Sequence, residues 1–252
     1  MEYFTFGMKC LRITQNYNGT TSHKSHWYKS KNYADYPIDC AGKDGGQDVY
    51  YAPCDMKVNA IRTEKQGYAN TIWLETLNKV MTPSGEHKVF IMLTHWNNND
   101  EYIRNLKENQ IVSAGTPICK EGMSGANANH LHIVVGNADL GTGNNLIKNS
   151  NGKWVSNGYC MKPEELMFID RDFTSESWGG CLVWKDKPKI EYYPIPNYTG
   201  VSIVDGLKCI GVNTSFFNRK KIANRNGIKN YIGTGKQNKQ LLDLLKSGRL
   251  VI

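Results

Sequence analysis

The sequence predicts a mainly β protein: an antiparallel β-sheet domain followed by a small helical domain. The first two-thirds of the chain carry short β-branched and aromatic runs, each bounded by Gly, Pro, Asn or Asp. The last fifty residues instead carry apolar residues at helical spacing. We therefore expect a β domain over residues 1–172, a Gly-, Pro- and Tyr-containing linker over 173–200, and a helical module over 201–252.

Seven segments of the first domain have the composition of strands, and their close succession favours antiparallel pairing. Residues 100–108 fit either a helix or a loop. Only 162–167 resembles a short helix, with Pro163 near its start. The expected strands are 8–17, 48–52, 56–62, 71–77, 88–94, 113–120 and 130–136.

The C-terminal region is expected to form three short helices, over residues 205–210, 218–226 and 236–247. Gly227 and Gly248 stand where the last two helices would stop. From residue 191 to the end, ten Lys and Arg face three acids, so +7 of the formal net charge of +8 lies here. A concentrated positive field favours a polyanionic partner, either nucleic acid or an anionic wall polymer.

Bulk features bear on the compartment. No apolar run approaches the roughly 18 residues that span a bilayer, so no membrane span is expected. The N-terminus lacks a basic region followed by an apolar one, which predicts cytoplasmic synthesis without a signal peptide. The odd number of cysteines, seven, argues against a closed disulfide framework.

The histidines are the most informative residues of the chain. His130 and His132 are two residues apart in a strand-like run, so both imidazoles point to one face of the sheet. His95 ends the strand-like run KVFIMLT, and His23 lies in a polar loop. Asp39 lies in YPIDCAG, an apolar stretch expected to run along the sheet.

This set contains enough ligands for catalytic zinc, which takes three protein ligands and leaves one position for water. One histidine of the H-x-H pair, Asp39 and a loop histidine, His23 or His26, would complete it. The other histidine of the pair and His95 would remain for proton transfer and charge stabilisation. His87, after a Ser-Gly pair, is expected to be an exposed turn residue.

Residues 10–136, about half of the chain, resemble the lysostaphin-type zinc metallo-endopeptidases, which cut peptide bridges of bacterial peptidoglycan. The similar segments occur in the family's order: ITQNYNG, Ser22-His23, YPIDCAG, YYAPCDMKVNAI, MLTHW and SAGTPICKEGMSGANANHLHIVVG. The last segment, with its HLH ending, is the most specific.

The resemblance implies zinc as the cofactor. His23, Asp39 and His132 would be its ligands, and His130 and His95 the catalytic pair. The chain departs from the family's usual H-x-x-x-D spacing, because Asp35 stands four residues before Asp39. The first histidine ligand must therefore come from further upstream. The distance from the ITQ strand and the preceding Ser favour His23 over His26, and Asp35 is a further, less favoured candidate.

The basic C-terminal piece resembles modules at the ends of clostridial and related phage lysins, which are thought to hold those enzymes on the wall. The expected partners are peptidoglycan and its anionic polymers. Arg225, Lys229 and Tyr231 are the candidate contacts.

Together these features predict a peptidoglycan hydrolase, an endolysin or tail-associated lysin, that cuts the wall stem or cross-bridge and acts on the bacterial cell wall. One alternative is a degenerate, non-catalytic relative that binds or regulates the wall. Nucleic-acid binding is disfavoured, since no groove-reading motif or aromatic stacking run accompanies the charge. The Ser22-to-His26 grouping also hints at zinc D-alanyl-D-alanine carboxypeptidases, but their acidic residue before H-x-H is not evident.

Overall fold

The computed structural model describes residues 2–19, 22–23, 35–42, 46–66, 69–149, 152–170 and 182–252, and the backbone of 172–176. The described chain forms two compact units, Glu2–Lys187 and Pro188–Ile252. The predicted linker over residues 173–200 overlaps both of them. Leu182, for example, is buried in the main core of the first unit.

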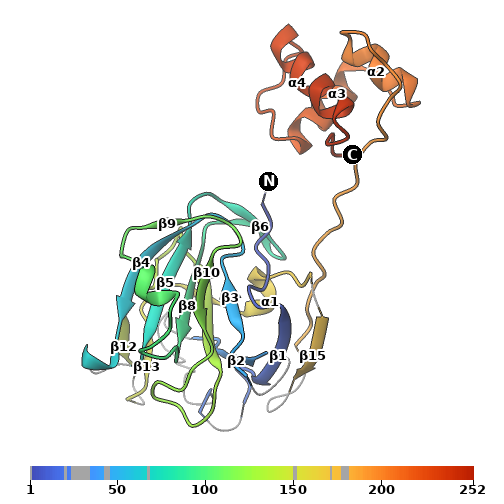
Figure 1. Cartoon of the computed structure of the whole chain (residues 1–252). Helices are drawn as coiled ribbons and strands as arrows, with labels where there is room; N and C mark the ends of the chain where they lie inside the picture. The colour runs from blue at the N-terminus through green and yellow to red at the C-terminus, as the bar shows by residue number, and fades with distance from the viewer. Residues whose placement is uncertain are drawn as a thin grey trace. The chain divides into compact units, whose positions relative to one another are not determined.

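A nine-stranded sheet forms the centre of the first unit (Figure 1). Its strands are β1 (Cys10–Gln15), β2 (Ile38–Ala41), β4 (Met56–Arg62), β5 (Thr71–Thr76), β8 (Val89–Thr94), β9 (Ile111–Val112), β11 (Leu131–Asn137), β14 (Cys160–Met161) and β15 (Asp172–Glu176). Their order is β15-β1-β2-β11-β8-β5-β4-β9, and β14 also pairs with β11. The β1–β15 pair is parallel and the other pairs are antiparallel, which confirms the expected fold class.

Three two-stranded sheets flank this sheet. They are β3 (Val49–Tyr51) with β10 (Pro117–Lys120), β6 (Val80–Thr82) with β7 (Gly85–His87), and β12 (Leu146–Lys148) with β13 (Trp154–Ser156). Helical turns occur at η2 (Glu64–Gln66), η3 (Ile103–Asn105) and α1 (Pro163–Leu166). His87 was expected in an exposed turn, but it lies in β7 and is half-buried. The side-chain amide of Asn137 lies 3.3 Å from its Nδ1.

The alternation of side chains decides which face of the sheet carries chemistry. On β2 and β11, Ile38, Cys40, Leu131 and Ile133 belong to the main core on one face. The residues between them therefore project from the opposite face, where a smaller cluster contains Trp73, Phe90, Met92 and Val134. Asp39 and His132 occupy these alternate positions, on the face with the smaller core.

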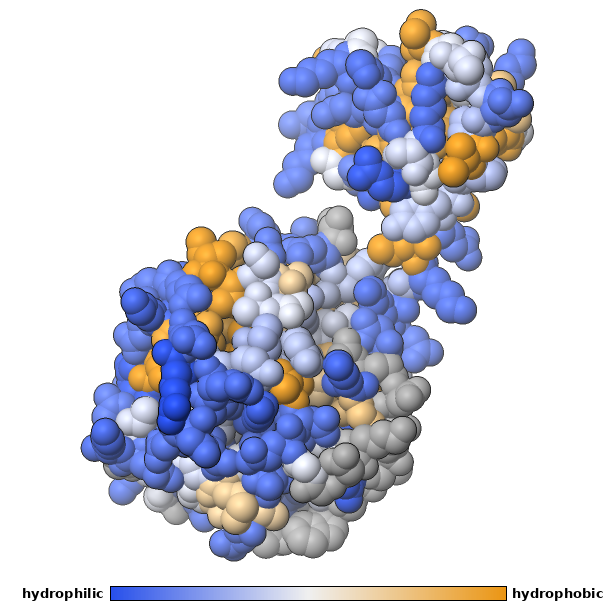
Figure 2. Space-filling view, viewed as in Figure 1, coloured by the Kyte–Doolittle hydropathy of each residue, from blue (hydrophilic) through white to orange (hydrophobic). Residues whose placement is uncertain are grey.

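The second unit contains the three expected helices, α2 (Ile203–Cys209), α3 (Phe216–Arg225) and α4 (Gly235–Lys246). Ser202, Ser215 and Thr234 cap their N-termini through side-chain oxygens. Gly248 follows α4 with φ +68°, as its predicted role at the helix end requires. Leucines 207, 241, 242, 245 and 250 form most of the core. On the face of this unit that Figure 2 shows, hydrophilic residues predominate, with hydrophobic residues between them.

Tyr231 corrects one expectation about this unit. We predicted a surface contact, but the side chain is only 1% exposed. Its hydroxyl donates to Asn238 Oδ1 and accepts a hydrogen bond from Arg219 Nε at 3.1 Å. Tyr231 is therefore a core residue, because its ring fills the helical core and its hydroxyl is hydrogen-bonded inside it. Arg225 and Lys229 are exposed.

Two absences concern the described residues alone. No helix among them combines the length and apolar character needed to cross a membrane. The six described cysteines are all free thiols.

Candidate metal centre

Strand register brings two parts of the site together. Asp39 on β2 and His132 on β11 are directly opposite each other in the antiparallel pair. On its other side, His132 is opposite Thr94, the last residue of β8, so His95 follows at the same end of the sheet. Residues 39, 94 and 132 are far apart in the sequence, and the strand order makes them neighbours.

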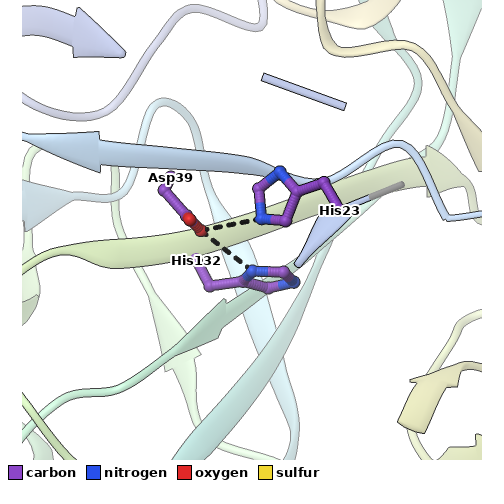
Figure 3. Close-up of side chains that lie close together, drawn as sticks. All are labelled: His23, Asp39 and His132. Carbon is purple, nitrogen blue, oxygen red and sulfur yellow. Dashed lines mark hydrogen bonds and ion pairs between the residues drawn. The ribbon is translucent and has the colours of Figure 1, made fainter. Parts of the chain in front are cut away.

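His23 completes a group of three potential ligands with Asp39 and His132 (Figure 3). His23 Nε2 lies 3.1 Å from Asp39 Oδ1, and His132 Nδ1 lies 3.0 Å from the same oxygen. The three ligand atoms are all within 4.8 Å of one another. Tetrahedral zinc, with bonds of about 2.0–2.2 Å, holds its ligand atoms about 3.4 Å apart. The donor set and its spacing therefore fit a zinc ion.

Neighbouring groups orient these ligands. His23 Nδ1 is 3.0 Å from the Asn16 carbonyl oxygen, which can only accept, so Nδ1 carries the hydrogen and Nε2 keeps its lone pair for a metal. Gln15 donates its side-chain amide to Asp39 Oδ2 at 3.0 Å, on the carboxylate oxygen that does not face the histidines. The Thr14 hydroxyl donates to the Asp39 carbonyl oxygen at 3.2 Å. The first strand thus supports the centre from one side.

The environment of Asp39 favours its charged form. Burial alone would raise the pKa of this carboxyl group, but the neighbouring His132 and His23 rings outweigh burial and hold the pKa well below its usual value. A carboxylate ionised at neutral pH is the form that binds a metal ion.

Two further histidines stand beside this group. The ring centroids of His95 and His130 are 4.7 Å apart, and those of His95 and His132 are 5.8 Å apart. His130 Nε2 is 3.6 Å from Asp39 Oδ1. His95 Nδ1 donates to the Ser124 carbonyl oxygen at 2.6 Å, and His130 Nδ1 donates to that of Ala128 at 2.9 Å. In the neutral form each ring keeps its lone pair on Nε2.

His95 also has an unusual backbone and an unusual pKa. Its φ is +83°, a conformation that costs free energy for any residue other than glycine and that clusters at functional sites. Burial lowers the pKa of its imidazole, with a smaller contribution from neighbouring His130. The neutral ring, which can accept a proton, is therefore the favoured form near pH 7.

Gly122 connects the supports of these two histidines. It forms a bridge with His130, whose amide donates to the Gly122 carbonyl oxygen at 3.2 Å. A Cβ atom at Gly122 would lie 2.3 Å from the carbonyl oxygen of His95. Only glycine at position 122 allows its backbone to approach His95, the residue after β8, this closely.

The five residues face a cleft of about 810 Å³. One wall consists of the small and amide residues 125–129, and Leu146 and Trp154 contribute to another. Thr71, Met92 and Thr94 line it from β5 and β8. The cleft is large enough for several residues of a peptide, and the candidate ligands lie at its surface.

Most of the candidate residues converge as expected. His23, Asp39 and His132 form the group of potential ligands, with His95 and His130 beside them. The alternative ligand His26 lies outside the described residues. Asp35 is a separate residue, buried and hydrogen-bonded to the Ser156 amide and the Cys160 thiol.

Some supporting groups were missed. Gln15 belongs to the quoted ITQNYNG segment, so a close reading of that motif could have suggested it. The carbonyl oxygens of Asn16, Ser124 and Ala128 carry no sequence signal at all, because every residue has one.

Comparison with known proteins gives partial likenesses. No family model matches the chain. The L-alanyl-D-glutamate peptidase of Listeria phage A118 is 45% identical over 100 residues, 39% of this chain. The chain spans about a third of the length of that protein, 33%.

Solved structures are similar at a lower level. A zinc-containing peptidase from Vibrio cholerae matches 53% of this chain and 36% of its own, with 21% identity and a TM-score of 0.34. The solution structure of lysostaphin matches 56% and 51%, with 18% identity and a TM-score of 0.30.

Proposed function

We propose that the chain is a zinc-dependent peptidase of the lysostaphin type that hydrolyses peptide bonds of bacterial peptidoglycan. The observation that carries the proposal is the convergence of two imidazole nitrogens and one carboxylate oxygen, with two more imidazoles beside them. The name of the partial relative from a Listeria phage specifies an L-alanyl-D-glutamate bond, which is wall-peptide chemistry. That relative also supports a phage lysin acting on the cell wall.

His23 Nε2, Asp39 Oδ1 and His132 Nδ1 are the atoms that would hold the zinc. Zinc bound there supplies Lewis acidity, which lowers the pKa of a water from 15.7 toward about 7 and polarises the scissile carbonyl. The hydrogen bond that Gln15 donates to Asp39 Oδ2 would hold Asp39 in its orientation toward the zinc. The cleft wall over residues 125–129 holds the peptide beside it.

His95 and His130 handle the proton. Their Nδ1 atoms are committed to backbone carbonyl oxygens, so their Nε2 atoms are available to the reacting groups. One ring accepts a proton from the attacking water as general base. The other, in its protonated form, stabilises the negative charge that develops on the carbonyl oxygen. The lowered pKa of His95 suits the first of these roles.

The C-terminal unit is proposed to hold the enzyme on the wall. Exposed Arg225 and Lys229 belong to the region that carries most of the positive charge, and wall polymers are anionic. The folded core beneath keeps these side chains on a fixed scaffold.

The rival function, a non-catalytic wall-binding relative, was suggested by the altered His-to-Asp spacing. The spacing does not prevent the two residues from meeting, since His23 Nε2 and Asp39 Oδ1 are 3.1 Å apart. We therefore favour the enzyme.

The test measures zinc content and lysis of purified walls for the wild type and for His23→Ala and His26→Ala. We expect about one zinc per chain, lysis that a chelator stops, and loss of both with His23→Ala alone. Mass spectrometry of the released fragments identifies the bond from its new termini. A wild type that carries no zinc and leaves walls intact, yet sediments with them, would establish the rival function instead.

A further inference from the structure

The β12–β13 hairpin forms part of the cleft wall with a defined face. Its register pairs Leu146 with Ser156 and Lys148 with Trp154. Leu146 and Lys148 share one face because they are two residues apart, and Trp154 stands opposite Lys148 on that face. Leu146 and Trp154 both line the cleft. The side chain of Val155, on the other face, is fully buried.

The hairpin is anchored below this face. The buried carboxylate of Asp35 accepts the Ser156 amide at 3.0 Å and the Cys160 thiol at 3.1 Å. The Ser156 hydroxyl donates to the Gly143 carbonyl oxygen at 3.4 Å. The base is therefore held by buried polar contacts, although Trp154 itself remains 41% exposed. A large exposed ring on an anchored support is suited to contact with a ligand.

A positive charge accompanies the ring. Lys148 Nζ lies 5.1 Å from the centroid of the Trp154 ring, within the range of a cation–π interaction. No Lys or Arg occurs among the described residues that line the cleft. Apart from its histidines, the ionisable side chain in that lining is Asp39, which is committed to the metal group. Lys148 does not itself line the cleft, but through Trp154 it places beside the hairpin wall a positive charge that the lining lacks.

We propose that this wall selects substrates with a free carboxylate: the Trp154 ring packs on the peptide backbone and Lys148 binds a carboxylate of the same segment. This inference rests on the proposed function and specifies its substrate class. An acidic peptide has both features, a flat backbone for the ring and an anion for the ammonium group. Leu146 beside the ring accommodates a small apolar side chain.

The test uses two soluble stem peptides that differ only in one group, a glutamate α-carboxylate or the corresponding carboxamide. Steady-state kinetics are measured for the full zinc-loaded chain and for Lys148→Ala, Lys148→Glu and Trp154→Ala. The wild type is expected to prefer the carboxylate peptide by about 3- to 5-fold in kcat/KM. Lys148→Ala should abolish this preference and Lys148→Glu reverse it. Trp154→Ala should raise KM by about tenfold for both peptides, with kcat less affected.

Matched controls separate recognition from structure. Lys153→Ala removes an exposed lysine of the same hairpin region, and Tyr159→Ala removes a ring that is likewise 41% exposed but does not line the cleft. Both should keep wild-type kinetics and preference. Trp154→Phe should recover most of the affinity, which a collapse of the hairpin would not allow.

A binding measurement without turnover tests this proposal separately from the proposed peptidase activity. Calorimetry on the full-length His130→Ala protein, with and without Lys148→Ala, measures the same preference without turnover. A carboxylate preference that depends on Lys148 supports the wall even if no peptide is cut, in which case the peptidase proposal fails alone. Equal affinity for both peptides, or a preference that survives Lys148→Ala, overturns the inference.

Discussion

The two units of the chain differ in where they keep their polar and charged groups. In Glu2–Lys187 the candidate site side chains are half-buried or buried on one face of a sheet, and His23, Asp39 and His95 each have a hydrogen-bond partner that orients them. In Pro188–Ile252 the core is nearly all apolar, and the charged groups stand on the exposed sides of helices. Metal chemistry needs atoms placed within fractions of an ångström, whereas adhesion to a polyanion needs only charge on a stable support.

The largest effect should follow the loss of a proposed zinc ligand from the first unit, Glu2–Lys187. His132→Ala removes one of the three proposed ligand atoms, and we expect zinc content and wall lysis to fall by more than the roughly 10- to 100-fold that loss of an outer-shell partner causes. Metal analysis and turbidity of wall suspensions measure this. His87→Ala is the matched control, since His87 lies in β7, outside the cleft lining. Wild-type zinc content in His132→Ala would contradict the ligand assignment.

The next effect tests whether orientation by a neighbour matters as much as the comparison implies. Gln15→Ala removes the amide that holds Asp39 Oδ2, and zinc affinity should fall by about 10- to 100-fold. Competition with a chromogenic chelator measures the change. Gln66→Ala, on an exposed turn, should leave affinity unchanged. If both variants bind zinc equally well, the ligands hold their positions without the first strand.

Wall binding by the C-terminal unit, if it is adhesive as proposed, should depend on charge and not on precise geometry. Reversing both charges, Arg225→Glu with Lys229→Glu, should weaken sedimentation with walls by roughly 3- to 10-fold at low salt, with less effect at high salt. Zinc content should stay at one per chain. The control reverses an exposed pair on the first unit, Arg104→Glu with Lys107→Glu. Equal losses in the two double variants would mean that net charge alone matters, and not the C-terminal unit.

A smaller effect concerns the core of the same unit. Tyr231→Phe deletes a buried hydroxyl and leaves Asn238 Oδ1 and Arg219 Nε without this partner. We expect a loss of about 1–2 kcal/mol in the free energy of unfolding of this unit, seen by thermal denaturation. Wall binding well below the transition should be unchanged. A binding defect with unaltered stability would return Tyr231 to the role of a contact.

The smallest effect is a pH dependence of the first unit. Burial would raise the pKa of Glu75, but bonds from Asn59 and the charges of Lys88 and Lys57 outweigh burial and lower it. A depressed folded-state pKa contributes stability above the unfolded value of about 4.3, and this contribution disappears as the pH falls through the folded pKa.

Glu75→Gln should therefore flatten the acid side of the stability profile by about 1 kcal/mol or less. Urea denaturation between pH 6 and about pH 3 compares it with the wild type. Exposed Glu86→Gln should keep the wild-type slope. Parallel profiles for wild type and Glu75→Gln would show that the carboxylate gains nothing from its partners.

The sequence pattern predicted the strands whose own residues alternate in burial or form a continuous buried run. The expected strand 56–62 coincides with β4, where buried and half-buried residues alternate. The runs at β5 and β8 were equally clear because all their residues are buried. β2, β12 and β13 have four residues or fewer, too few for a period to show. Their existence depends on neighbours supplied by the tertiary fold.

The same distinction holds for the site. The H-x-H spacing and the strand-ending His95 indicated shared faces, and the structure places them accordingly. The role of Gln15 depends on the antiparallel pairing of β1 with β2, which opposes Gln15 to Asp39. Tyr231 was misjudged because basic neighbours suggest a surface, whereas burial was decided by packing against α3 and α4.

Gly122 has a consequence for how mutations at this site combine. Gly122 pairs with His130, and a Cβ at this position would collide with the carbonyl oxygen of His95, so the backbone of both histidines depends on the same glycine. A side chain at position 122 must displace both ends at once, so Gly122→Ala should reproduce much of the double histidine loss without removing either ring. Laboratory selection for new specificity would therefore find little variation at this position and more along the hairpin wall. The proposed catalytic histidines and the proposed selectivity wall would then vary independently of each other.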